Sequence, residues 1–171
     1  MFFCKELNIV IKYTCINNPE ELNEEFEKYM KIVEIIKKLD KEYSNIFYTS
    51  LELKKYENGY REIMEYAGNS LIKIYNNKEK DNNSWIEVLL QFPELIKILD
   101  ELHKMKIFIR DLKPDNICYN PSTKKMVIID VEFLIKTDPD TVSICGTPSY
   151  ISPFDIKAIQ KRRPINLVLF D

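Results

Sequence analysis

A long amphipathic helix over residues 19–39, flanked by β-type segments, limits the fold of this chain more than any other feature. Asn18, Pro19 and the acidic pair after them supply a helix cap, a first-turn proline and a favourable first-turn charge. Apolar residues then recur every three or four positions: Leu22, Phe26, Tyr29, Val33 and Ile36. Such a stripe buries one face of a helix and leaves its Glu and Lys residues in water.

Three β-type segments surround this helix. Residues 8–13 alternate and then run apolar, which predicts a strand. Residues 46–53 and 60–66 are also β-rich, and they are joined through Asn58-Gly59. This dipeptide tolerates the positive φ angles of a tight turn, so the pair predicts a β-hairpin.

The second half of the chain predicts another long helix and two more strands. Residues 84–87 form a capping-box pattern, and an apolar stripe continues to about Met105, with Pro93 as an expected break or restart. The stripe comprises Leu95, Ile98, Leu99 and Leu102. Beyond a short apolar run at 107–109, residues 117–119 and 126–129 flank a turn at 120–122, which predicts paired strands.

Composition excludes several classes of protein. The 171 residues suit one domain, and 25 basic and 27 acidic side chains are mixed along the chain, which argues against a nucleic-acid partner. No apolar run approaches the length of a membrane span, so no membrane association is expected. Four separated cysteines and a single histidine give no metal-binding cluster. We expect a soluble intracellular protein, most simply a cytoplasmic one.

One stretch carries a chemical signature. Residues 109–116 read I-R-D-L-K-P-D-N, and residues 127–130 read V-I-I-D. The first resembles the catalytic loop of eukaryotic-type Ser/Thr protein kinases, H-R-D-x-K-x-x-N, and Asp130 stands where that family has the aspartate of D-F-G. The resemblance implies phosphoryl transfer from ATP with Mg²⁺ as the metal.

That reaction explains why these residue types are needed. One carboxylate must orient the attacking hydroxyl and accept its proton, and Asp111 matches that role. Lys113 would neutralise charge on the transferring phosphoryl group. Asn116 and Asp130 would supply hard oxygen ligands to Mg²⁺.

Two further segments resemble the nucleotide-binding part of the family. Lys12, in I-V-I-K at 9–12, resembles the lysine that contacts the α- and β-phosphates, and either Glu34 or Glu27 would pair with it. Residues 63–71 resemble the strand and hinge between lobes. The resemblance implies that backbone groups of Glu65 and Ala67 hydrogen-bond adenine and that Met64 guards the inner pocket.

Residues 146–153 resemble the end of the kinase activation segment, G-T-x-x-Y-x-A-P-E. Thr147 in this segment and Lys113 in D-L-K-P-x-N favour Ser/Thr over Tyr substrates. Arg110 would pair with a phosphate on Thr141 or Ser143 if the chain is regulated as kinases with an Arg before the catalytic Asp are.

The chain also departs from the family pattern. Its three glycines all serve elsewhere, so no Gly-rich phosphate loop is expected. Lys12 comes so early in the sequence that the first hairpin of the small lobe is also expected to be absent. The family's C-terminal helical bundle is likewise expected to be absent from this sequence. Ile109 replaces His, Val131-Glu132 replaces Phe-Gly, and Phe154 replaces the Glu of A-P-E.

The sequence therefore predicts an α+β, protein-kinase-like bilobal fold that is incomplete. It would form a single truncated domain over 1–171, with a reduced small lobe at 1–66 and the hinge and first part of the large lobe at 67–171. The expected function is that of a Ser/Thr protein kinase, weakened or inactive if the missing parts are required. The alternative is a pseudokinase or decoy that docks on another kinase or a regulator. A small-molecule phosphotransferase would have no use for the segment at 146–153.

Overall fold

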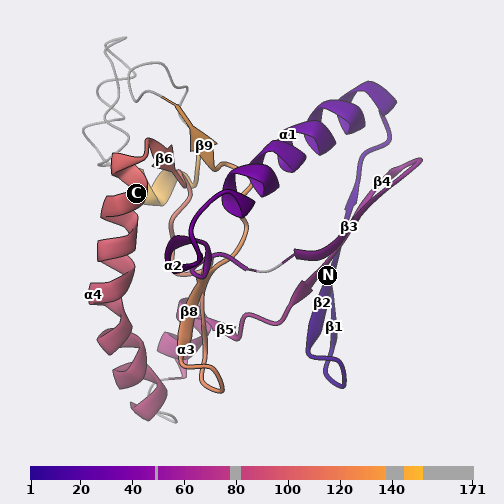
Figure 1. Cartoon of the computed structure of the whole chain (residues 1–171). Helices are drawn as coiled ribbons and strands as arrows, with labels where there is room; N and C mark the ends of the chain where they lie inside the picture. The colour runs from indigo at the N-terminus through magenta and orange to yellow at the C-terminus, as the bar shows by residue number, and fades with distance from the viewer. Residues whose placement is uncertain (49, 78–81, 138–144, 152–171) are drawn as a thin grey trace. The chain divides into compact units, whose positions relative to one another are not determined.

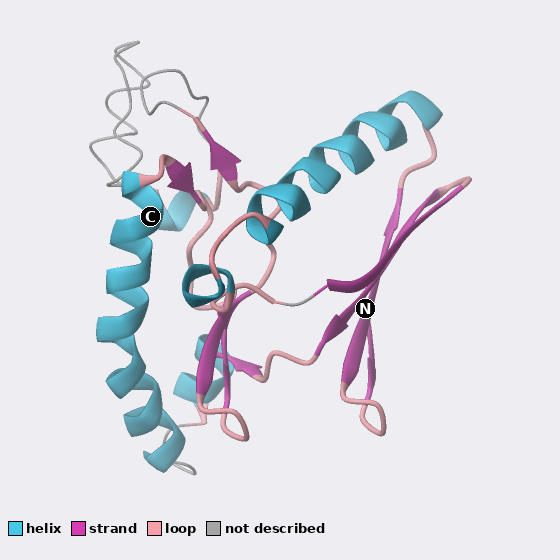
Figure 2. Ribbon diagram, in the orientation of Figure 1, coloured by secondary structure: helices cyan, strands magenta, loops and turns pink. Residues whose placement is uncertain are grey.

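The computed structural model describes residues 1–48, 50–77, 82–137 and 145–151, and its strands and helices form two compact units (Figures 1 and 2). The first unit is Met1–Gly68 and the second is Asn69–Asp171. Both units combine helices with antiparallel strands, so the predicted α+β class is confirmed.

A four-stranded antiparallel sheet forms the body of the first unit. Its strands are β1 (Phe2–Cys4), β2 (Ile9–Cys15), β3 (Ser50–Tyr56) and β4 (Gly59–Glu65), in the order β1-β2-β4-β3. The strand predicted at 8–13 is confirmed as β2, but β1 was not predicted. The strand predicted from residue 46 was placed too early, since β3 begins at Ser50. Phe47 and Tyr48, whose apolar character suggested a strand, are buried in the segment that precedes it.

Helix α1 (Pro19–Lys37) covers one face of this sheet and confirms the predicted helix. The Asn18 side chain accepts a hydrogen bond from the Glu20 backbone N–H at 2.9 Å, which caps the first turn. The rings of Phe26 and Tyr29 lie 5.8 and 5.9 Å from the ring of Tyr60 on β4. Aromatic contacts thus fix α1 on the face of the sheet that Tyr60 occupies. A short helix, α2 (Lys41–Ser44), follows.

The predicted hairpin forms through a two-residue turn in which Gly59 has a special position. Tyr56 pairs with Gly59, so Glu57 and Asn58 make the turn. Gly59 has φ of 148°, and a Cβ atom there would collide with the Thr14 carbonyl oxygen on β2. Only glycine allows the two backbones to approach this closely.

Replacing Gly59 by Ala is therefore expected to lower the free energy of unfolding by about 1–3 kcal/mol. The physical reason is the added methyl group, which must push β2 and β4 apart at a backbone contact that has no flexible side chain to yield. Urea unfolding followed by circular dichroism measures the change. Asn58→Ala, in the exposed turn, is the matched control and should change stability by less than about 0.5 kcal/mol.

The described part of the second unit combines helices with small antiparallel sheets. The helices are α3 (Leu71–Asn76), α4 (Asn82–Lys104) and the 3₁₀ turn η2 (Pro148–Tyr150). The strands are β5 (Asn69–Ser70), β6 (Ile107–Phe108), β7 (Ile117–Asn120), β8 (Lys125–Ile128) and β9 (Ile135–Lys136). They pair as β5-β7-β8 and β6-β9. The predicted pairing of 117–119 with 126–129 is confirmed.

Helix α4 corrects two local predictions. The helix begins at Asn82, so Ser84 lies inside the first turn and does not cap it. It also continues through Pro93, where a break was expected. Pro93 and Leu89, whose carbonyl loses its partner, are both exposed, so water can satisfy that carbonyl. Among the described residues, no helix is long and apolar enough to span a membrane.

The core of the second unit lies between α4 and the strands that follow it. Leu102 on α4 is fully buried, as are Ile107 and Phe108 on β6. Tyr119 on β7 is buried as well, and its hydroxyl donates to the Glu87 carboxylate on α4 at 2.7 Å. This core supports the loop between β6 and β7, which carries the predicted catalytic residues.

Candidate active site

The loop over residues 109–116 leaves β6 and returns to β7 as a tightly held segment. The Asn116 N–H donates to the Lys113 carbonyl at 2.9 Å, which closes a turn. The Ile72 N–H at the start of α3 donates to the Pro114 carbonyl at 3.3 Å. Ile109, which replaces the family's His, is 2% exposed and therefore fills an apolar site. The loop is therefore held at both ends and in the middle.

Four donors surround the carboxylate of Asp111. Its Oδ1 accepts hydrogen bonds from the Thr147 backbone N–H at 2.9 Å and the Thr147 hydroxyl at 2.7 Å. Its Oδ2 accepts from Lys113 Nζ at 2.8 Å and Asn116 Nδ2 at 2.9 Å. Since Asp111 is buried, these bonds hold the carboxylate in one orientation.

Thr147 links Asp111 and Lys113 across 34 or more positions of sequence. Lys113 Nζ donates to the Thr147 hydroxyl oxygen at 2.7 Å, and that hydroxyl donates in turn to Asp111. In the sequence, Thr147 indicated Ser/Thr substrates, but no local pattern showed that it would contact Asp111.

This network controls the charge of both partners. Burial by itself raises the pKa of Asp111, but the hydrogen bonds from Lys113 and Thr147 outweigh it and hold that pKa below its usual value. The Asp111 carboxylate raises the pKa of Lys113, with smaller contributions from Asp130 and Asp115. Asp111 is thus an anion and Lys113 a cation near neutral pH.

Replacing Thr147 by Val should destabilise the chain in a pH-dependent way. At neutral pH the loss of a hydrogen bond to a charged group costs about 1.5–3 kcal/mol. Because the pKa of Asp111 is lowered by folding, the stability from its ionised form is lost as pH falls through that pKa. The difference from the unsubstituted chain should therefore be largest near pH 7 and shrink in acid.

Urea unfolding at neutral and acidic pH measures this difference. Thr123→Val is the matched control, since among the described residues the Thr123 hydroxyl bonds a backbone carbonyl, that of Asn120, and no charged group. Its effect should not change with pH. A Thr147→Val deficit that is the same at both pH values would contradict the coupling to Asp111.

Asn116 and Asp130 come together through the backbone. The Ile129 N–H, next to Asp130, donates to the Asn116 carbonyl at 2.8 Å. Asn116 Nδ2 donates to Asp111 twice, to the backbone carbonyl at 3.0 Å and to the carboxylate, so its Oδ1 is the end of the amide left to accept a cation. The Asp130 carboxylate helps to raise the pKa of Lys113, so its charge acts on the same cluster.

This donor set fits a magnesium ion. Amide and carboxylate oxygens are hard ligands, and Mg²⁺ is typically held by one or two protein oxygens with water and phosphate completing its shell. Within the described residues, no three His, Cys, Asp or Glu side chains gather into a metal site.

Two residues of this loop system have positive φ angles although they are not glycine. Arg110 has φ of 67° and Asp130 has φ of 61°. The buried Arg110 donates from Nε to the Phe133 carbonyl at 2.7 Å, so it ties the catalytic loop to the segment after Asp130. Such strain concentrates at functional sites. Thr141 and Ser143, the predicted phosphate carriers, lie outside the described residues, as does Phe154.

The substitution after Asp130 leaves the loop packed. Val131 is buried and Glu132 is exposed, so the valine fills an apolar position while the glutamate faces water. The chain then forms β9, where Ile135 pairs with Phe108 on β6. Asp130 therefore lies between two paired strands: β8 before it, which pairs with β7, and β9 after it, which pairs with β6.

Lys12 and the predicted hinge residues belong to the first unit. Lys12 is half-buried on β2. On the same strand, Val10 pairs with Met64, which is buried, and Ile9 pairs with Glu65, which is exposed. Ala67 is half-buried in the segment beyond β4. Because the Asp111 cluster belongs to the second unit, the joining of both groups around one nucleotide stays a prediction.

Neither predicted helix partner of Lys12 faces the sheet. Glu27 and Glu34 are both exposed on α1, and Glu34 lies 4.0 Å from Lys38 on the helix surface. The buried position of this part of α1 is taken by Ile32.

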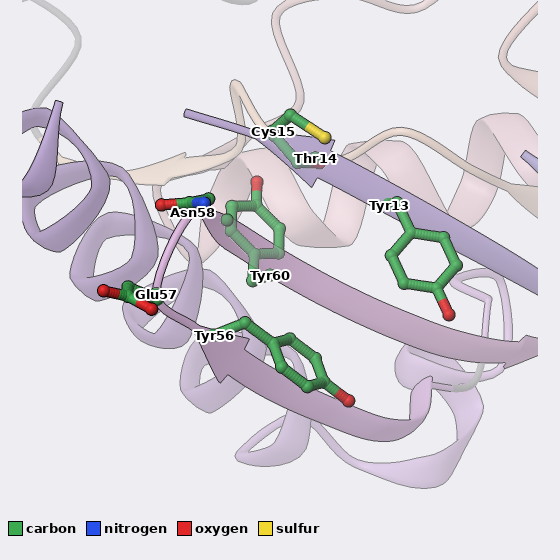
Figure 3. Close-up of a pocket in the computed structure, with 8 residues that line it drawn as sticks. Tyr13, Thr14, Cys15, Tyr56, Glu57, Asn58 and Tyr60 are labelled. Carbon is green, nitrogen blue, oxygen red and sulfur yellow. The ribbon is translucent and has the colours of Figure 1, made fainter. Parts of the chain in front are cut away.

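A separate hollow of about 410 Å³ lies beside the β3–β4 turn (Figure 3). It is bordered by the rings of Tyr13, Tyr56 and Tyr60 and by Cys15. None of the predicted site residues lines it.

Comparison with known sequences agrees with this geometry. A family described as "Protein kinase domain" matches residues 5–166, which include every predicted site residue. The chain belongs to the protein kinase family. The α+β units described above are therefore parts of a kinase-like fold.

Individual kinases show similarity over different lengths. The chain is 25% identical over 149 residues to the probable serine/threonine-protein kinase mps1 of Dictyostelium discoideum, which covers 84% of this chain and 15% of that protein. It is 34% identical over 116 residues to the serine/threonine-protein kinase nekl-2 of Caenorhabditis elegans, covering 61% of this chain and 31% of that protein. It is 40% identical over 60 residues to a cAMP-dependent protein kinase catalytic subunit 3 of Drosophila melanogaster, covering 35% and 10%. The chain thus spans less than a third of the length of these kinases.

Proposed function

We propose that this kinase-family chain transfers the γ-phosphoryl group of ATP to a Ser or Thr hydroxyl of a protein. The observation that carries the proposal is the network around Asp111, in which four donors hold one buried carboxylate. A group that orients a hydroxyl and accepts its proton must be ionised and fixed in direction. Asp111 meets both conditions.

Lys113 and Thr147 support this role. Lys113 lies 2.8 Å from Asp111 and bears a charge that can offset negative charge on a transferring phosphoryl group. Thr147 donates its hydroxyl to Asp111 at 2.7 Å, so the segment at 146–151 lies beside the proposed base and would help to place a protein substrate.

Asn116 and Asp130 would hold Mg²⁺ through Oδ1 and the carboxylate, as their chemistry allows. When bound, the metal would neutralise charge on the β- and γ-phosphates. Lys12 would contact the phosphates, Met64 would border the adenine site, and the backbone of Glu65 and Ala67 would bond adenine. In this proposal the two units are a reduced small lobe, near 1–66, and the hinge with the first part of the large lobe, near 67–171.

A second candidate is a binding module of the pseudokinase type, which docks on another kinase or a regulator. It is favoured by Val131-Glu132 in place of Phe-Gly and by the engagement of all three glycines away from a phosphate loop. The intact donor set at Asp111, Lys113, Asn116 and Asp130 favours the enzyme, because docking alone needs no magnesium ligands. The four cysteines are not in disulfides, which fits an intracellular, reducing setting for either function.

One experiment separates these candidates. The purified chain is incubated with Mg²⁺, γ-labelled ATP and a generic Ser/Thr substrate, with and without EDTA. Labelling that EDTA abolishes supports the enzyme. Absence of labelling, together with nucleotide-independent binding to a purified kinase, supports the docking module and rejects the enzyme.

A further inference from the structure

A buried carboxylate lies in the sheet of the first unit, away from the Asp111 cluster in sequence. Glu62, in the middle of β4, is 3% exposed. The Tyr29 hydroxyl lies 2.8 and 2.9 Å from its two oxygens, and the Tyr48 hydroxyl donates to Oε1 at 2.9 Å. One tyrosine comes from α1 and the other from the segment before β3, so three parts of the unit converge on this side chain.

A buried carboxylate also needs a cation, because hydroxyl donors alone do not offset its loss of hydration. The strand register provides one: Glu62 lies directly opposite Lys12 on β2. Directly opposed residues of antiparallel strands share one face of the sheet, with their Cβ atoms about 4.5–5.5 Å apart. On the other side, β3 places Leu53 opposite Glu62, which offers no charge.

Lys55 is the other cation on the same face of the neighbouring strands, and it is engaged elsewhere. It is opposite Tyr60 on β4, one diagonal step from Glu62. Its ammonium bonds the Asn23 side chain on α1 and lies 5.5 Å from the centre of the Phe26 ring. Lys12 is therefore the cation that the register assigns to Glu62.

Neither glutamate of helix α1 that the sequence offered as a partner for Lys12 is buried against the sheet. Both residues, Glu27 and Glu34, are exposed. The buried face of the helix presents Ile32 and, one turn earlier, Tyr29, whose hydroxyl contacts Glu62. The helix thus contributes a hydroxyl to the site, while the negative charge comes from the sheet.

We propose that Glu62 is the residue that positions the Lys12 ammonium for the phosphates of ATP, in place of a glutamate on helix α1. Lys12 is then held from the neighbouring strand, and α1 acts through the Tyr29 hydroxyl. The catalytic role of Glu62 rests on the proposed function, whereas its pairing with Lys12 does not.

The test measures Lys12 directly. Lysines of the full chain are reductively methylated with ¹³C, and the Lys12 signal is assigned by its absence in Lys12→Arg. Titration by NMR then gives the pKa of Lys12, and calorimetry gives the affinity for Mg²⁺ with a non-hydrolysable ATP analogue. Glu62→Gln should lower the pKa of Lys12, because the anion that favours its charged form is gone. It should also weaken nucleotide binding about tenfold, or about 1.4 kcal/mol.

Glu27→Gln and Glu34→Gln are the matched controls and should change neither quantity. An unchanged Lys12 pKa in folded Glu62→Gln overturns the pairing, whatever the nucleotide affinity. If the pKa falls but the unsubstituted chain binds no nucleotide, the pairing stands and the proposed kinase function fails.

A stability measurement covers the case in which Glu62→Gln does not fold. Lys12→Met leaves Glu62 without its cation, so the double variant Lys12→Met/Glu62→Gln should melt about 3–6 °C higher than Lys12→Met alone. A double variant that melts at the same temperature as Lys12→Met, or at a lower one, rejects the pairing.

Discussion

Replacing Asp111 by Asn is expected to reduce phosphoryl transfer by about 10²–10⁴-fold, the usual contribution of a general base. The amide cannot accept the proton of the attacking hydroxyl. It also turns an NH₂ group toward donors on one side, either Lys113 and Asn116 or the N–H and hydroxyl of Thr147. The rate of labelling of a Ser/Thr substrate from Mg·ATP measures the loss.

Asp115→Asn is the matched control because Asp115 is an exposed carboxylate of the same loop. Its rate should stay within about twofold of the unsubstituted chain, in line with the small effect of surface substitutions. A circular dichroism melt of each variant separates a lost base from a lost fold. A folded Asp111→Asn variant that keeps its rate would remove Asp111 from the mechanism.

Replacing Asp130 by Asn should lower the rate by about 10²–10³-fold, a loss typical of removing one electrostatic contact to the reacting groups. The neutral amide is a weaker ligand for Mg²⁺ than the carboxylate, so the Mg²⁺ concentration for half-maximal rate should also rise. Because the Asp130 carboxylate helps to raise the pKa of Lys113, that pKa should fall in the variant. Rate against Mg²⁺ concentration is the decisive measurement.

Glu132→Gln is the control for Asp130, since Glu132 is exposed two residues later and has no proposed ligand role. Its Mg²⁺ dependence should match that of the unsubstituted chain. An Asp130→Asn variant with lower rate but unchanged Mg²⁺ dependence would show that Asp130 acts on the loop and not on the metal.

The fold was predictable where local signals agree with one another. Helix α1 has a side-chain cap, an N-terminal proline and a regular apolar stripe, and it forms close to the predicted limits. Gly59 marked the hairpin correctly. Strand β1 was missed because three residues carry too little pattern to identify, and it forms only by pairing with β2.

The wrong prediction of a break in α4 has a different origin. Pro93 was expected to break the helix because proline removes one backbone hydrogen bond. The surrounding helix is held by buried side chains on both sides, such as Val88 and Leu102, and the affected turn faces solvent. Tertiary packing therefore outweighed a local preference.

The candidate site divides in the same way. Asp111, Lys113 and Asn116 were recognisable because they lie within six residues of each other in a distinctive pattern. The contact of Thr147 with Asp111 joins residues 36 positions apart. The opposition of Glu62 and Lys12 depends on strand register, and a shift of one residue would move Glu62 to the other face of the sheet.

The sequence alone identified which carboxylates, amide and lysines could act on a nucleotide. It also identified most of the segments that form helices and strands. Motifs and apolar periodicity are patterns among residues that are close in sequence, so both kinds of feature could be recognised along the chain. Tertiary structure alone decided which distant groups meet, namely Thr147 on Asp111 and Tyr29 and Tyr48 on Glu62. Such contacts are made by the packing of whole elements, and no short stretch of sequence contains both partners.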